Sequence, residues 1–161
     1  RVAQLGTAER TAAGTTLRAL TPAEERRFPL IAMLMPALER SLTTHDAHEA
    51  MLAGTRIMIA IERFRARHGE LPESLDRLVP EFLAHLPPDP FTGKPFGYRR
   101  FEAPDAIGRR YVFYSFGSDG VDNGGTLTDP KLNFFGRSNA DRQMKTDYVF
   151  NLPRSSFVPN D

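Results

Sequence analysis

The chain of 161 residues has no cysteine, almost no net charge and no long apolar run. Without cysteine it can form neither a disulfide framework nor a thiolate metal site, and thiol catalysis is excluded. Its 21 Lys and Arg residues against 20 Asp and Glu give a formal net charge of +1. A charge so close to zero produces no global field that would attract nucleic acid or an acidic membrane surface. We therefore expect no nucleic-acid partner.

The longest apolar run is Pro29–Leu38, about half of the ~20 residues that a membrane-spanning helix needs. Because it also contains two prolines, we interpret it as a core or interface segment. The chain begins at Arg1 rather than at methionine, so we expect a fragment or a processed product. Any membrane anchor or export signal of the parent protein would then lie before Arg1.

Two helical regions are predicted in the first half of the chain. Residues 1–45 show little periodicity and are interpreted as a partly helical lead-in, with a helix start at Thr21–Glu25, where a capping threonine precedes a proline and two acids. From about Asp46 to His68, apolar residues recur at steps of three and four, which predicts a long amphipathic helix ending at Gly69. An earlier start, near Pro36, would place Leu38 and Leu42 on the same buried face.

The remainder of the chain predicts a small sheet. A short helix is expected within 72–80, and the four prolines of 86–95 require an ordered connector without regular structure. Three aromatic runs bounded by glycine and proline predict strands at 96–101, 110–116 and 148–152. Segregated helix and strands indicate an α+β fold, in which a long helix packs on a small three-stranded antiparallel sheet within residues 46–161.

The most distinctive chemistry lies in Tyr114–Gly125, where an aromatic strand stops in a loop of two aspartates, one asparagine and four glycines. Calcium takes about six to eight oxygen ligands, including backbone carbonyls that a curled loop can direct inward. A tight hairpin turn is the alternative, because Asp-Gly, Asn-Gly and Gly-Gly are strong turn formers.

Four segments follow one another in a recognisable order: Ile61–Pro72, Ser74–Pro80, Leu86–Tyr98 and Tyr114–Gly120. In this order they resemble the periplasmic part of the type II secretion major pseudopilins, and of a wider set of bacterial proteins with a similar C-terminal module. The resemblance covers about residues 46–152. It implies a helix packed on a three-stranded sheet, calcium bound in the loop before the last strand, and a structural role in a short periplasmic filament for protein export.

The resemblance also implies cation ligands. The position of Phe116 supplies a backbone carbonyl and that of Asp119 a carboxylate. Asp122 and Asp147 are candidates to complete the ligand set, and further candidates are Asp129 and Asp141. Two features depart from the family: its hydrophobic N-terminal helix is not among these residues, and the stretch 125–147 is longer than the family loop.

We therefore expect a non-catalytic structural subunit or module of a bacterial envelope or protein secretion assembly, stabilised by calcium. Its partners would be copies of itself or other envelope subunits, on the periplasmic or extracellular face, with membrane tethering only through a segment outside this chain. One alternative is a pilin-like binding module at the C-terminus of a larger envelope protein. Another is a hydrolase in which Asp119 pairs with Asp122 or Asp147, because glycosidase chemistry needs two acids.

Two further groups of residues have simpler interpretations. His45 and His48 could contribute to a zinc or nickel site, but the HxxxH spacing is missing, and we interpret residues 45–49 as a solvated helix end. Several arginines could form a basic surface, which we interpret as solvated faces and strand edges because the net charge is close to zero: Arg63, Arg65, Arg67, Arg99, Arg100, Arg109 and Arg110.

Overall fold

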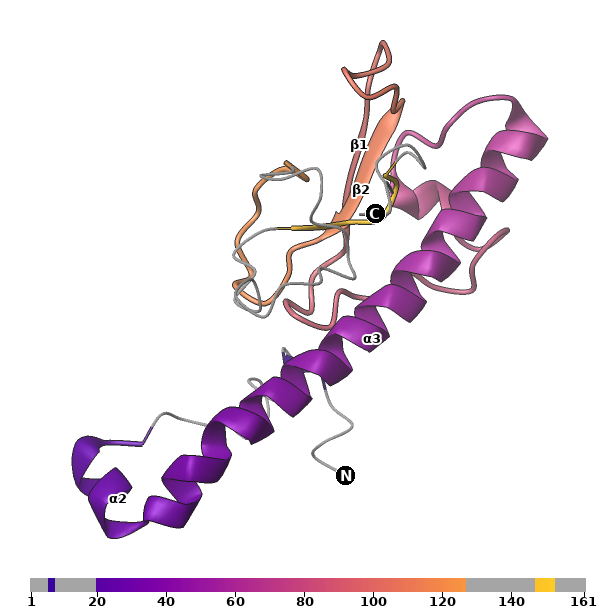
Figure 1. Ribbon diagram of the computed structural model, residues 1–161. Helices are drawn as coiled ribbons and strands as arrows, with labels where there is room; N and C mark the ends of the chain where they lie inside the picture. The colour runs from indigo at the N-terminus through magenta and orange to yellow at the C-terminus, as the bar shows by residue number, and fades with distance from the viewer. Residues whose placement is uncertain (1–5, 8–19, 127–146, 153–161) are drawn as a thin grey trace, which may run out of the picture.

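A computed structural model describes residues 6–7, 20–126 and 147–152 of the chain. In Figure 1 a long helix, α3 (Pro29–His68), runs beside a small sheet that lies against only part of its length. The rest of α3 extends beyond the sheet, and the short helix α2 (Pro22–Arg27) lies at that end. The predicted α+β fold, with one long helix and a three-stranded antiparallel sheet, is confirmed.

The predicted helix start at Thr21 is also confirmed. Thr21 and Glu24 cap α2 reciprocally: the Glu24 N–H donates to Thr21 Oγ1 at 3.3 Å, and the Thr21 N–H donates to Glu24 Oε2 at 2.9 Å. These bonds satisfy donors that the first turn of a helix cannot satisfy itself. The chain then turns at Phe28 and enters α3.

The predicted start of the long helix, at Asp46 or near Pro36, is wrong, because α3 begins at Pro29. Proline is well suited to the first turn, where its missing N–H would have had no helical partner. The predicted C-terminal end is confirmed: Gly69 has φ of 76°, and its N–H donates to the Arg65 carbonyl at 2.9 Å. Among the described helices, none combines the length and apolar character needed to cross a membrane.

The two halves of α3 have different surroundings. No residue of the outer half, residues 29–44, is buried, and Leu38 is 51% exposed instead of continuing the buried face. In the inner half, residues 45–68, the buried positions recur with helical spacing: Asp46, Ala50, Ala53, Gly54, Ile57, Ala60, Ile61 and Phe64. The sheet therefore covers only the inner half.

Residues 45–49 lie in the middle of α3, so their interpretation as a helix end is wrong, although His48 and Glu49 are exposed as expected. Asp46 is fully buried and accepts a hydrogen bond from the Thr7 hydroxyl. His45 Nε2 is buried and has no hydrogen-bond partner among the described residues. Polar residues at 45–49 favoured a solvent-facing helix end, whereas Asp46 is buried against Thr7, a residue distant in the sequence.

The sheet has strand order β1-β2-β3, with β1 at Gly97–Arg100, β2 at Tyr111–Ser115 and β3 at Tyr148–Val149. The third strand is shorter than the predicted 148–152. Its pairing with β2 is continued by other groups, because the Asn151 amide donates to the Tyr111 carbonyl at 2.6 Å and accepts from the Phe113 N–H at 3.0 Å. A side chain thus replaces the last rung of the ladder.

Strand β2 is buried on both faces. Phe113 is fully buried between the sheet and α3, and its ring lies 5.5 Å from that of Phe96 and 5.0 Å from that of Phe150, centroid to centroid. Val112 and Tyr114 belong to a second cluster, which also contains Val149. A short 3-10 helix, η2 (Leu75–Leu78), adds Leu75 and Leu78 to the helix-side core.

Candidate metal centre

The second face of β2 is contacted by the glycine-rich loop, Gly117–Thr126. This loop contains four glycines with positive φ, a backbone conformation that L side chains rarely adopt. Gly125 also packs against β2, since a Cβ at this position would lie 2.8 Å from the Tyr114 ring. Glycine is therefore required at 125 both for the backbone conformation and for the close contact with the strand.

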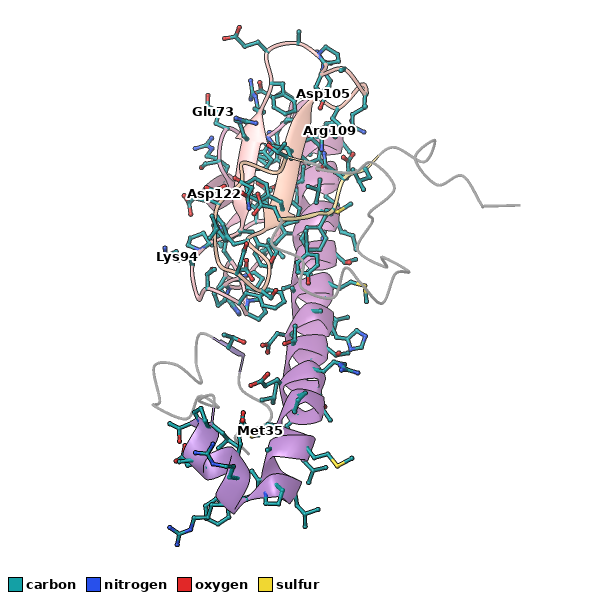
Figure 2. All side chains as sticks on the ribbon, turned by 60° about the vertical axis from the view of Figure 1, so that its left-hand side comes forward. Met35, Glu73, Lys94, Asp105, Arg109 and Asp122 are labelled. Atoms are coloured by element: carbon teal, nitrogen blue, oxygen red, sulfur yellow. The ribbon has the colours of Figure 1, made fainter. Side chains whose placement is uncertain are left out.

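Asp122 is held against the sheet by β2. Its Oδ1 accepts hydrogen bonds from the Tyr114 hydroxyl and from the Gly124 N–H, both at 2.8 Å. Figure 2 shows Asp122 beside the strands, far from the outer half of α3, where Met35 is labelled. Burial raises the pKa of the Tyr114 hydroxyl, and the hydrogen bond to Asp122 raises it further. The phenol therefore stays protonated and acts as a donor to this carboxylate.

Asp147, immediately before β3, joins the same loop from a distant part of the sequence. Its Oδ2 accepts hydrogen bonds from the Gly125 N–H at 2.7 Å and from the Asn123 N–H at 3.0 Å. Among the residues that the structure describes, its Oδ1 is buried and has no hydrogen-bond partner. A carboxylate oxygen removed from water is costly unless a donor or a cation compensates it.

The electrostatic surroundings of Asp147 are acidic. Burial raises the pKa of its carboxyl group, the two backbone N–H donors lower it, and the negative charges of Asp122 and Asp119 raise it. Asp119 is exposed, and its Oδ1 accepts a hydrogen bond from the Val121 N–H at 3.1 Å. Burial raises the pKa of Tyr148, and the negative charge of Asp119 raises it further. Asp119, Asp122 and Asp147 therefore act on one small region at the start of β3.

Phe116 lies where β2 leads into the loop. Its N–H donates to Asp89 Oδ2 at 2.8 Å, and its ring lies 5.8 Å from that of Tyr114. Asp129 and Asp141, the further ligand candidates, lie outside the described residues. Of the four principal candidates, Asp122 and Asp147 both accept hydrogen bonds from backbone N–H groups of the glycine-rich loop, Asp119 is exposed on that loop, and Phe116 lies just before it.

Carboxylate and carbonyl oxygens are the donors that calcium prefers, so the residue types of this loop fit a calcium ion. Within the described residues there is no group of three or more His, Cys, Asp or Glu side chains placed to hold a metal ion as they stand. Calcium also accepts backbone carbonyl and water oxygens in a flexible geometry. The observation that favours a cation is the buried Asp147 Oδ1. It has no hydrogen-bond partner within residues 6–7, 20–126 and 147–152, and the charges of two further carboxylates act on the same group.

Sequence reasoning missed Asp89, in the proline-rich connector. This carboxylate is fully buried and accepts hydrogen bonds from the Ser115 hydroxyl, the Phe116 N–H and the Phe91 N–H at 2.8, 2.8 and 3.0 Å. Burial raises the pKa of Asp89, and these hydrogen bonds lower it in part. The available signal was an acid between prolines in a segment that had to be ordered without regular structure.

No family model, curated protein or solved structure matches this chain.

Proposed function

We propose that this protein is a non-catalytic, pseudopilin-like structural subunit or module of a bacterial envelope or protein secretion assembly. The observation that carries the proposal is the division of α3, whose inner half packs on the sheet while its outer half presents apolar side chains to solvent. A helix with this division can connect a folded domain to neighbouring subunits. The second part of the proposal is that calcium stabilises the glycine-rich loop.

The outer half of α3 is unusually apolar for an exposed helix. Met33 is 80% exposed, Leu30 76% and Leu34 60%, and no charged residue lies between Phe28 and Glu39. A helix that is apolar on all sides is normally buried, whereas a solvated helix has a polar face. Exposed apolar patches of this kind mark surfaces for protein partners. Copies of this chain or other envelope subunits are the proposed occupants.

The arginines on α3 support the expectation of no nucleic-acid partner. Arg65 pairs with Glu62 at 2.7 Å, and Arg67 pairs with Glu81 at 2.8 Å. Acidic neighbours thus offset part of the positive charge on this face of the helix. A phosphate backbone needs clustered, uncompensated cations.

Calcium would compensate the carboxylates of the glycine-rich loop. The carboxylates of Asp119, Asp122 and Asp147 and the carbonyl of Phe116 are the proposed protein ligands. The cation would offset their mutual repulsion and would tie the start of β3 to the end of β2. Extracellular modules bind calcium with dissociation constants of about 0.1–1 mM, so such a site suits the periplasmic or extracellular face of the envelope.

We expect the chain to self-associate through the outer half of α3. In sedimentation velocity the wild-type chain should form oligomers as its concentration rises, and Leu30→Lys with Leu34→Lys should leave monomers, because burying two lysines in an apolar contact is costly. The matched control is Leu52→Lys with Ile59→Lys, which changes two exposed apolar residues of the inner half. Wild-type chains that stay monomeric at every concentration would contradict self-assembly.

Calcium should raise the melting temperature, and a chelator should lower it by several degrees. Binding to the folded state alone, at a hundred times the dissociation constant, adds about 2.7 kcal/mol, and each kcal/mol shifts the melting temperature of a chain of this size by about 2–4 °C. Asp119→Ala and Asp147→Asn should each abolish most of this response in calorimetric melts. Identical wild-type melting curves with calcium and with chelator would reject the site.

A further inference from the structure

The connector Asp89–Phe91 contacts the end of β2, just before the glycine-rich loop, and the start of β3, although it supplies none of the proposed cation ligands. We propose that this connector positions the loop for calcium, so that Asp89 and Phe91 set the affinity of a site that they do not touch. The inference rests on the calcium site proposed above. It is carried by hydrogen bonds and a ring contact that join three segments distant in the sequence.

The first contact fixes the end of β2. Asp89 Oδ2 accepts hydrogen bonds from the Ser115 hydroxyl and from the Phe116 N–H, each at 2.8 Å. Ser115 Oγ in turn accepts a hydrogen bond from the Gly117 N–H at 3.2 Å. Asp89 and Ser115 are both fully buried, so no water competes for these bonds. The Phe116 carbonyl is therefore flanked by two backbone N–H groups, of Phe116 and Gly117, that are both hydrogen-bonded.

The second contact fixes the start of β3. The Phe91 ring stacks on the Tyr148 ring with centroids 5.6 Å apart and an interplanar angle of 30°. Tyr148 directly follows Asp147, whose buried Oδ1 has no hydrogen-bond partner in the described part of the chain. Phe91 is bound to the first contact as well, because its N–H donates to Asp89 Oδ1 at 3.0 Å. The connector Asp89–Phe91 therefore fixes the position of Phe116 relative to that of Asp147.

The connector is itself anchored. The Asp89 N–H donates to the Lys94 carbonyl at 2.8 Å, and the Gly93 N–H donates to the Asp89 carbonyl at 2.7 Å, which closes a tight turn. Phe91 and Tyr148 form one buried cluster with Ala50 of α3. The connector therefore holds the proposed ligands Phe116 and Asp147 in position relative to α3.

Positioning of this kind acts on affinity because each ligand is held close to its bound place before the cation arrives. Without the connector, calcium binding would also have to order the end of β2 and the start of β3. The entropy lost in that ordering would make the net free energy of binding less favourable. Residues that orient metal ligands without touching the metal typically change the affinity by roughly 10–100-fold when they are replaced.

The test measures calcium affinity in the full chain by isothermal titration calorimetry with Ca²⁺ alone. Asp89→Asn keeps the size of the side chain but replaces one acceptor oxygen with an N–H₂ group, so either the Phe116 or the Phe91 N–H loses its partner. Phe91→Leu removes the stacking on Tyr148. For each variant we expect the dissociation constant to rise roughly tenfold or more, with all proposed ligands intact.

The matched control is Asp105→Asn, because Asp105 also accepts backbone hydrogen bonds, from Ile107 at 3.1 Å and Arg109 at 2.8 Å, but in the distant β1–β2 hairpin. Urea unfolding in chelator should show lower stability for the control and for the connector variants. Only the connector variants should lose calcium affinity. A merely structural role would lower stability and leave the dissociation constant at the wild-type value.

The outcomes separate this inference from the calcium proposal. If the wild-type chain binds no calcium, the proposed site itself fails. If the wild-type chain binds and the connector variants bind equally well, or if Asp105→Asn weakens binding to the same extent, the positioning role alone is overturned. Should Asp89→Asn fail to fold, Phe91→Leu and Ser115→Ala decide the question. Ser115→Ala removes the donor to Asp89 and the acceptor of the Gly117 N–H, and it leaves the Phe116 bond to Asp89 in place.

Discussion

A Phe113→Ala chain is expected to lose about 3–5 kcal/mol of unfolding free energy, the usual cost of truncating a buried phenylalanine. Phe113 is fully buried at the centre of the sheet and contacts the rings of Phe96 and Phe150. Its removal leaves a cavity between the sheet and α3 that neither element can close alone. Because small domains are stable by only about 5–15 kcal/mol, a large part of the total would be lost.

Urea unfolding followed by far-ultraviolet circular dichroism measures this change. The control is Ile59→Ala, which removes an apolar side chain of α3 that is 56% exposed and should change the stability by no more than about 0.5 kcal/mol. Equal losses in the two variants would show that the contact between sheet and helix does not dominate the stability.

The inner half of α3 was predictable because local signals there agree with the packing. Apolar residues at helical spacing, from Ala50 to Phe64, form the face that the sheet covers. Gly69 was predicted to end the helix and does end it, because glycine tolerates the positive φ at that position without strain.

The outer half of α3 was not predictable by the same reasoning. Periodicity arises when one face of a helix is buried and the other is solvated. Residues 29–38 are apolar on every side, so they show no helical period, and Pro36 argued for a boundary there. In the structure α3 nevertheless continues through Pro36 and begins at Pro29.

The candidate site was predictable in composition but not in its connections. The glycines and acids of residues 117–125 indicated an oxygen-rich loop with special backbone angles, and positive φ is found at Gly117, Gly120, Gly124 and Gly125. The bond between Tyr114 and Asp122 and the role of Asp89 arise from tertiary contacts. No local pattern encodes which backbone N–H groups a buried carboxylate will meet.

A Gly54→Val chain should be about 3 kcal/mol less stable than the wild type, at the upper end of the usual cost of overpacking. Gly54 lies buried on α3, and a Cβ at this position would overlap the ring of Phe150. In an isolated helix, replacing glycine would be favourable by up to about 1 kcal/mol, so the clash must exceed that gain. Thr55→Val, which places the same side chain at the adjacent exposed position, should be nearly neutral.

Combining Gly54→Val with Phe150→Leu tests whether this clash is the cause. Leucine lacks the ring atoms that a side chain at position 54 would meet, so the double variant should be more stable than the sum of the two single losses predicts, by about 1 kcal/mol or more. Additive losses in urea unfolding would contradict the contact. A positive coupling would show that Gly54 is required because α3 and the segment after β3 approach too closely for any side chain at this position. This close approach is the contact through which the inner half of α3 packs on the end of the sheet.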